Sequence, residues 1–172
     1  MNLSWCLQTG RLQLTPVSWA DLADLVALKG DPRAYAMMLG GVRTQTEVAE
    51  ELAEEMADWP RLGFGMWSVR LLSTRRFVGI VGLQERPDGR GVGLRFSLLP
   101  SDQGLGYASE AAGAALRFGH DRAGLTRIVG VTREDNFASM TVLGAIGMQH
   151  RETFSRDGVV LLLSESTVQL VD

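Results

Sequence analysis

Apolar and polar residues alternate along several short stretches of the chain, and this period of two predicts β-strands. The clearest case is RLQLTPV, Arg11–Val17, in which the apolar side chains fall on every second position. Clusters of turn-forming residues such as PDG at 87–89 separate the stretches. By the same criteria we expect further strands at 64–72, 76–84, 91–100, 126–132, 151–163 and 166–171, with a turn at Asp157-Gly158.

Four other stretches carry apolar residues at the spacing of an amphipathic helix, and they are expected at 18–29, 44–59, 107–119 and 136–148. Ser18 and Asn136 can cap two of these helices, and Thr44 or Thr46 a third. The remaining helix has one small, apolar face, made of Ala108, Ala111, Ala112, Ala115, Leu116 and Gly119. The order of strands and helices predicts an α/β domain spanning 1–172, with a mixed sheet and helices on its faces.

Composition and charge narrow the range of functions. No apolar run approaches the roughly 18 residues of a membrane span, and the first residues lack the pattern of an export signal. Cys6 is the one cysteine, so no intramolecular disulfide can form and a cytoplasmic protein is the simplest interpretation. The net charge of −3 gives no electrostatic reason to expect nucleic-acid binding. No Cys/His cluster has metal-ligand spacing, so no metal is expected.

The sequence SDQGLGYASEAAGAALRF, 101–118, places two glycines directly before a helix. A helix N-terminus offers unpaired N–H groups and a partial positive charge, and glycines let an anion approach them. A tight turn without a ligand is one interpretation. A dinucleotide site would require a third glycine where Ser109 stands, and a Walker-type loop would require a lysine after the glycines. The third interpretation is a site for the pyrophosphate of coenzyme A.

PSDQGLGYASEA resembles the acyl-CoA-binding signature of the GNAT superfamily of N-acetyltransferases, and in particular the branch of the ribosomal-protein N-terminal acetyltransferases. The resemblance extends over almost the whole chain, through TGRLQLTPV, KGDPRAYAMMLGG, GFGMWSV and TRIVGVTREDNFASMTVLGAIGM. It implies one GNAT domain with a mixed, largely antiparallel sheet of about six to seven strands and helices on both faces. It also implies acetyl-CoA as acyl donor and direct transfer of the acetyl group to a primary amine.

The resemblance also implies roles for individual residues. Leu98 and Leu99 would pair their backbone with the pantetheine arm of CoA, and one N–H would polarise the thioester carbonyl. Asn136 would bind the pantetheine arm or the end of the preceding strand, and Ser139 would lie near the sulfur as a candidate acid. The pyrophosphate would be held by a loop made of Gln103, Gly104, Leu105, Gly106, Tyr107 and Ala108.

The sequence departs from the family pattern at the general base. Many relatives carry a glutamate in the fourth strand where this chain has Gly93, and many enzymes outside this branch carry a tyrosine where it has Leu143. Glu85 is the nearest substitute base, with Glu134 and Asp135 as others, although a solvated surface role fits each of them and a water chain would need no side chain. The helix expected at 44–59 is rich in acidic residues, and its glutamates are expected to form a solvated face: Glu47, Glu50, Glu51, Glu54 and Glu55.

Three functions therefore remain open at this level, the weakest of them a nucleotide-binding protein that uses the same glycine loop. The first is an acetyl-CoA-dependent N-acetyltransferase whose acceptor is a small amine or a protein or peptide N-terminus. The second is a catalytically weak or inactive acyl-CoA-binding protein that senses or regulates. For either of these first two functions we expect coenzyme A as a partner, neither nucleic acid nor membrane, and a chain that is compatible with a homodimer.

Overall fold

One mixed sheet runs through the molecule, and within residues 2–169, which the computed structural model describes, it has eight strands in the order β1-β2-β3-β4-β5-β6-β8-β7. Neighbouring strands are antiparallel except β5 and β6, which are parallel. The strands are β1 (Leu7–Gln8), β2 (Leu12–Pro16), β3 (Met66–Leu71), β4 (Phe77–Glu85), β5 (Val92–Leu98), β6 (Arg127–Arg133), β7 (Gln149–Arg156) and β8 (Val159–Thr167).

The fold class is confirmed, and the strand number is slightly higher than the six to seven expected. The two-residue β1 is too short to produce an alternating pattern. The stretch 151–163 divides at the Asp157-Gly158 turn into β7 and β8. Of the strand expected at 166–171, only positions 166 and 167 belong to β8. Positions 168 and 169 are not in a strand, and those from 170 onward lie outside the described residues.

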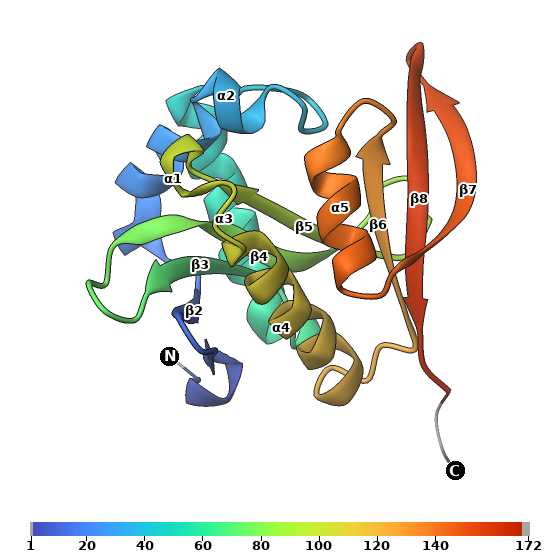
Figure 1. Cartoon of the computed structure of the whole chain (residues 1–172). Helices are drawn as coiled ribbons and strands as arrows, with labels where there is room; N and C mark the ends of the chain where they lie inside the picture. The colour runs from blue at the N-terminus through green and yellow to red at the C-terminus, as the bar shows by residue number, and fades with distance from the viewer. Residues whose placement is uncertain (1, 170–172) are drawn as a thin grey trace.

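Helices cover both faces of the sheet (Figure 1). Thr44 caps α3, since its hydroxyl accepts from the Glu47 N–H while the Glu47 carboxylate accepts from the Thr44 N–H. The helix ends at Gly63, whose φ of 78° is the left-handed conformation that glycine adopts easily. The helices are α1 (Leu22–Lys29), α2 (Pro32–Tyr35), α3 (Gln45–Leu62), α4 (Tyr107–Asp121) and α5 (Phe137–Ala145), with short 3-10 turns at Leu3–Trp5, Trp19–Asp21 and Pro100–Asp102.

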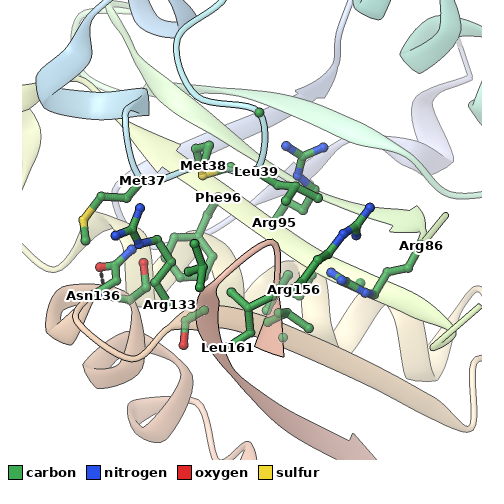
Figure 2. A pocket seen from close by; sticks show the side chains of 18 of the residues that line it. Met37, Met38, Leu39, Arg86, Arg95, Phe96, Arg133, Asn136, Arg156 and Leu161 are labelled. Atoms are coloured by element: carbon green, nitrogen blue, oxygen red, sulfur yellow. Dashed lines mark hydrogen bonds between the residues drawn. The ribbon is translucent and has the colours of Figure 1, made fainter. Parts of the chain in front are cut away.

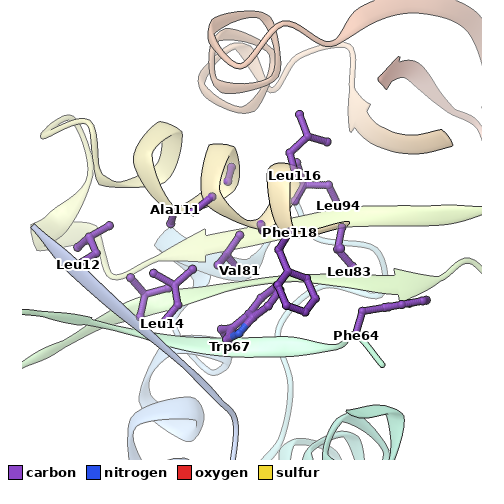
Figure 3. Close-up of a cluster of buried hydrophobic side chains, with 14 of the residues drawn as sticks. Leu12, Leu14, Phe64, Trp67, Val81, Leu83, Leu94, Ala111, Leu116 and Phe118 are labelled. Atoms are coloured by element: carbon purple, nitrogen blue, oxygen red, sulfur yellow. The ribbon is translucent and has the colours of Figure 1, made fainter. Parts of the chain in front are cut away.

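Two apolar clusters hold these layers together. One packs α4 against the sheet and includes Leu14, Trp67 and Phe118 (Figure 3). The other lies under α1 and α3 on the opposite face. The small face of α4 is needed for close packing, because a Cβ on Gly119 would lie 2.5 Å from Ile128 Cδ1. The alanine-rich pattern therefore lets α4 lie close to the sheet, and this places its N-terminus beside the end of β5.

Candidate active site

The sheet opens between β5 and β6. In the described part of the chain these strands pair at only two positions, Val92 with Ile128 and Gly93 with Val129. Beyond them β5 continues to Leu98 paired with β4 alone, and β6 continues to Arg133 paired with β8 alone. The two strands therefore present facing backbone edges, which an extended ligand can use for hydrogen bonds.

The register of β5 determines which of its backbone groups face this gap. The Leu99 N–H donates to the Val78 carbonyl over 2.9 Å. Because successive residues of a strand point their N–H and C=O groups to opposite sides, the groups of Phe96 and Leu98 point toward β6. The Leu98 carbonyl already accepts from Gln103 Nε2 at 3.1 Å. Of the two predicted pantetheine partners, Leu98 thus directs its N–H into the gap, whereas the Leu99 N–H is already bonded within the sheet.

The glycine loop lies where β5 leads into α4. Gly104 and Gly106 have φ values of 77° and 81°, a conformation that strains residues with a side chain. Gly106 is the N-cap residue of α4, and among the described residues no side chain caps this helix. The N–H groups of its first turn therefore remain available to an anion, as the sequence led us to expect.

Side chains outside the loop hold it in place. Arg11 donates to the Leu105 carbonyl over 3.0 Å and to the Glu110 carboxylate over 2.7 Å, and its guanidinium lies 4.5 Å from the Tyr107 ring centroid. On the other side, Arg76 forms two hydrogen bonds with the buried Asp102, of 2.9 and 2.6 Å. This pair lowers the pKa of the Asp102 carboxyl below its usual range. These contacts fix the loop, and among its own N–H groups only that of Gln103 has a partner in the described residues, the Pro100 carbonyl at 3.4 Å.

A cavity of about 450 Å³ adjoins the gap. Its walls come from the segment 36–43 after α2, the end of β4, the facing parts of β5 and β6, the start of α5 and the β7–β8 turn (Figure 2). Asn136 and Ser139 both line it. The Asn136 side-chain oxygen accepts from the Ser139 N–H at 3.1 Å, and the Asn136 N–H donates to the Arg133 carbonyl at the end of β6. Asn136 thus caps α5, as predicted, and places the Ser139 side chain in the first turn of that helix.

The candidate bases differ in where they lie. Glu85 lines the cavity, but its side chain is 56% exposed and its carboxylate is 3.2 Å from Arg61 of α3. Glu134 and Asp135 are exposed and do not belong to the described cavity lining. Hydrogen bonds from Arg133 lower the pKa of Asp135, which weakens it as a base. Gly93 lines the cavity, and a Cβ there would lie 3.1 Å from Arg86 Cγ, so a side chain at this position would have to displace the Arg86 side chain by a few tenths of an ångström.

The expectation of a fully solvated glutamate face on α3 is wrong for two residues. Glu55 is buried and Glu51 is half-buried, because both accept hydrogen bonds from the buried Lys29 at 2.9 and 2.8 Å. Burial raises the pKa of Glu55. Burial acts in the same sense on Glu51, but hydrogen bonds from Lys29 and Arg43 bring its pKa below the usual range. The helical period locates charged residues on a face but does not reveal that a lysine from α1 lies under it.

This buried cluster supports one wall of the cavity. Glu51 accepts from Arg43 Nε at 2.5 Å, and the Arg43 guanidinium also donates to the carbonyls of Leu39 and Gly41. The segment 36–43 is therefore tied to α3 beside the gap between β5 and β6. Sequence reasoning missed Arg43 as a cavity residue, and it also missed Arg86, Arg95, Arg133 and Arg156. Only Arg95 carried a signal, as a charged residue within an otherwise apolar strand.

Within residues 2–169, no group of three or more His, Cys, Asp or Glu side chains is placed to hold a metal ion. In the same part of the chain, no helix combines the length and apolar character that crossing a membrane requires.

Comparisons with known proteins agree with this geometry. Residues 11–149 match the family described as an acetyltransferase (GNAT) domain. The chain is 30% identical over 164 residues to the FsC-acetyl coenzyme A-N(2)-transacetylase of Aspergillus fumigatus, an alignment that covers 86% of this chain and 66% of that protein. An acetyltransferase structure from Agrobacterium tumefaciens is similar with a TM-score of 0.84 and 25% identity, covering 95% of this chain and 94% of the other. The structure of RimL, a ribosomal L7/L12 alpha-N-protein acetyltransferase in complex with coenzyme A, is similar with a TM-score of 0.78 and 17% identity. The similarity covers 95% of this chain and 98% of the RimL chain.

Proposed function

The chain belongs to the GNAT acetyltransferase family, and we propose that it transfers an acetyl group from acetyl-CoA directly to a primary amine. One observation carries the proposal. The open gap between β5 and β6 and the uncapped N-terminus of α4 are joined by the short segment from Leu98 to Gly106. A ligand with an extended arm and a pyrophosphate, such as CoA, fits both features at once.

The loop residues divide the binding of CoA between them. Gly104, Leu105, Gly106, Tyr107 and Ala108 would present N–H groups to the pyrophosphate, and Gln103 would fix the loop to the end of β5 through its bond to Leu98. Leu98 would pair with the pantetheine arm through its N–H. Both backbone groups of Leu99 already have partners, since its N–H donates to the Val78 carbonyl and its carbonyl accepts from the Asp102 N–H. Asn136 would offer its side-chain NH₂ from the facing edge of the gap, since its oxygen already caps α5.

The chemistry requires few protein groups. The amine nitrogen attacks the thioester carbonyl, a C–N bond forms, the C–S bond breaks, and CoA departs as a thiolate. A fixed N–H donor at the end of β5 would stabilise the oxyanion that develops on the carbonyl oxygen. An ammonium acceptor would first lose a proton to water, since the attacking amine must be neutral. As the C–S bond breaks, Ser139 would pass its hydroxyl proton to the departing thiolate and regain a proton, through water, from the nitrogen that becomes the amide. Because a thiolate is a good leaving group, we expect Ser139→Ala to lower kcat only modestly.

The second candidate function is an acyl-CoA-binding protein with little or no catalysis. It is favoured by the position of Glu85, which pairs with Arg61, and by Gly93 at the place of the usual base. The enzyme remains the better conclusion because a cavity of about 450 Å³ lies beside the gap and can hold an acceptor. The acceptor itself would be a small amine or a protein or peptide N-terminus, and the reaction would take place in the cytoplasm.

A screen of amine acceptors separates the two functions. Release of the CoA thiol is followed with acetyl-CoA present and each amine added in turn, and CoA binding is measured separately by calorimetry. The enzyme predicts amine-dependent release with at least one acceptor class. Tight CoA binding without release for any amine would favour the regulatory protein, whereas a failure to bind CoA would overturn both.

A further inference from the structure

The cavity beside the gap has a basic lining. Five arginines line it, namely Arg43, Arg86, Arg95, Arg133 and Arg156, against two acidic residues. The chain as a whole carries a net charge of −3, so this lining is not a consequence of a basic composition. A cavity with one sign of charge attracts ligands of the opposite sign.

Three of these arginines have a carboxylate within hydrogen-bond distance. Arg43 bonds Glu51, Arg86 bonds Asp88 at 2.6 Å, and Arg133 bonds Asp135 at 3.0 Å. Their charges are largely compensated within the protein. The excess positive charge of the cavity therefore lies with the other two, Arg95 on β5 and Arg156 at the end of β7.

Arg156 has an unused donor. Its Nη1 is buried and, among the described residues, has no hydrogen-bond partner, while the side chain as a whole is 39% exposed. The nearest carboxylate is Asp157, whose Oδ2 lies 3.9 Å from Arg156 Nε and whose side chain is 92% exposed. A buried donor without a partner is unfavourable, because it has lost its bonds to water. A ligand in the cavity that accepts this hydrogen bond removes that penalty.

Arg95 adds a second charge nearby. Its Nη1 donates to Gln84 Oε1 at 2.8 Å, and in the described chain no carboxylate lies within ion-pair distance of it. Its charge is felt at longer range by the buried Glu55. Figure 2 shows Arg86, Arg95 and Arg156 gathered on one side of the cavity, and Asn136 on the other.

We propose that the acceptor is a small amine that carries a carboxylate, and that Arg156, with Arg95 beside it, binds this carboxylate. The proposal rests on the proposed function and assigns a substrate class to the same cavity. The amine of the acceptor would lie toward Ser139 and the N–H of Leu98, and its carbon skeleton would lie against Phe96 and Leu161. Polyamines and other multiply cationic acceptors would be repelled by the uncompensated arginines.

The test uses acceptors in matched pairs. Glycine, β-alanine, 4-aminobutanoate and phenylalanine are each compared with their carboxamides, and kcat/KM is measured by thiol release in the presence of saturating acetyl-CoA. The ratio of acid to amide is then compared between the parent protein and the variants Arg156→Gln and Arg95→Gln. Comparing these ratios cancels the difference in intrinsic reactivity between the two amines of a pair.

The control is Arg151→Gln. Arg151 lies on the same strand as Arg156 and bonds Glu165 at 2.8 Å, outside the described cavity lining. The substitution removes the same charge without changing the proposed site. For the best acid of the series we expect Arg156→Gln to lower the acid-to-amide ratio by about 10- to 100-fold, the worth of a hydrogen bond to a charged group. Arg95→Gln should lower it in the same direction, and Arg151→Gln should leave it unchanged.

Several outcomes would overturn the proposal. One is an acid-to-amide ratio of kcat/KM that does not change in Arg156→Gln. Another is a higher kcat/KM for dipeptide amides than for every acid of the series. A failure of the proposed function looks different, since no amine then gives thiol release. In that case CoA-loaded protein is titrated with the N-acetyl derivatives of the same acids and amides. Tighter binding of the acids that is lost in Arg156→Gln supports the carboxylate site, and equal binding refutes it.

Discussion

Replacing Lys29 by methionine should destabilise the protein strongly. Lys29 is fully buried, and its Nζ lies 2.9 Å from Glu55 Oε1 and 2.8 Å from Glu51 Oε2. Methionine fills a similar volume without a charge, so the main loss is electrostatic. Glu51 keeps its bond to Arg43. Glu55 is left buried with neither oxygen paired, because its Oε2 already has no hydrogen-bond partner among the described residues. Removing one member of a buried ion pair typically costs about 3–5 kcal/mol.

The loss should depend on pH in a defined direction. Burial raises the pKa of Glu55, and Lys29 opposes this rise. Without Lys29 the folded-state pKa of Glu55 rises further, while the unfolded value stays near 4.3. A group whose folded pKa is raised stabilises the fold below the unfolded pKa, and this stability is lost as pH rises through the folded pKa. The deficit of the variant should therefore be smallest near pH 5 and grow toward pH 8, by at most about 1.4 kcal/mol per pH unit.

The free energy of unfolding is measured in urea, with tryptophan fluorescence as the signal. The signal reports on the core, because the indoles of Trp5, Trp59 and Trp67 pack together there. The exposed Arg61 of α3 serves as a control, since Arg61→Met should hardly move the midpoint. The double variant Lys29→Met/Glu55→Leu should recover most of the lost stability, because an apolar pair of similar volume often replaces a buried ion pair without loss. A loss of stability below about 1 kcal/mol that is the same at pH 5 and at pH 8 would show that the buried Glu55 does not depend on Lys29.

Three further predictions concern the site. Gly106→Val should weaken CoA binding in calorimetry by at least about tenfold, whereas Gly124→Val, at a glycine with a similar positive φ just beyond the C-terminal end of α4, should bind CoA like the parent. Gly93→Glu should not raise kcat, because its Cβ would lie 3.1 Å from Arg86 Cγ; a clear gain in turnover would contradict this. Glu85→Gln should keep most of the activity, and a drop of about 100-fold or more with unchanged CoA affinity would instead identify it as the general base.

Much of the fold could be predicted because local signals agreed with the tertiary structure. Alternation located β2, the Thr44–Glu47 pair marks the start of α3, and the small face of α4 indicated a close helix–sheet contact. The resemblance over the glycine loop indicated the family. These features depend on residues that are neighbours in sequence, and period and capping chemistry express them directly.

The remainder depends on contacts between distant residues. The burial of Glu55 results from Lys29, which is on another helix, and no property of the α3 sequence reveals it. The basic lining of the cavity combines Arg95 of β5 with Arg156 of β7, which the strand order brings to one site although 61 residues separate them in sequence. Periodicity gives the face of each strand but not which strands surround a cavity. The register that turns the Leu98 N–H toward the gap likewise required the structure.

Initial rates with both substrates varied decide whether the acetyl group passes directly from acetyl-CoA to the amine in the gap between β5 and β6. Thiol release is measured over a grid of acetyl-CoA and acceptor concentrations, and the acetylated amine is quantified in parallel. Direct transfer predicts saturation in both substrates, intersecting double-reciprocal lines and one acetylated amine for each thiol released. Parallel lines would indicate a covalent acetyl-enzyme and contradict direct transfer, and thiol release that does not depend on the amine would contradict acetyl transfer to an amine altogether.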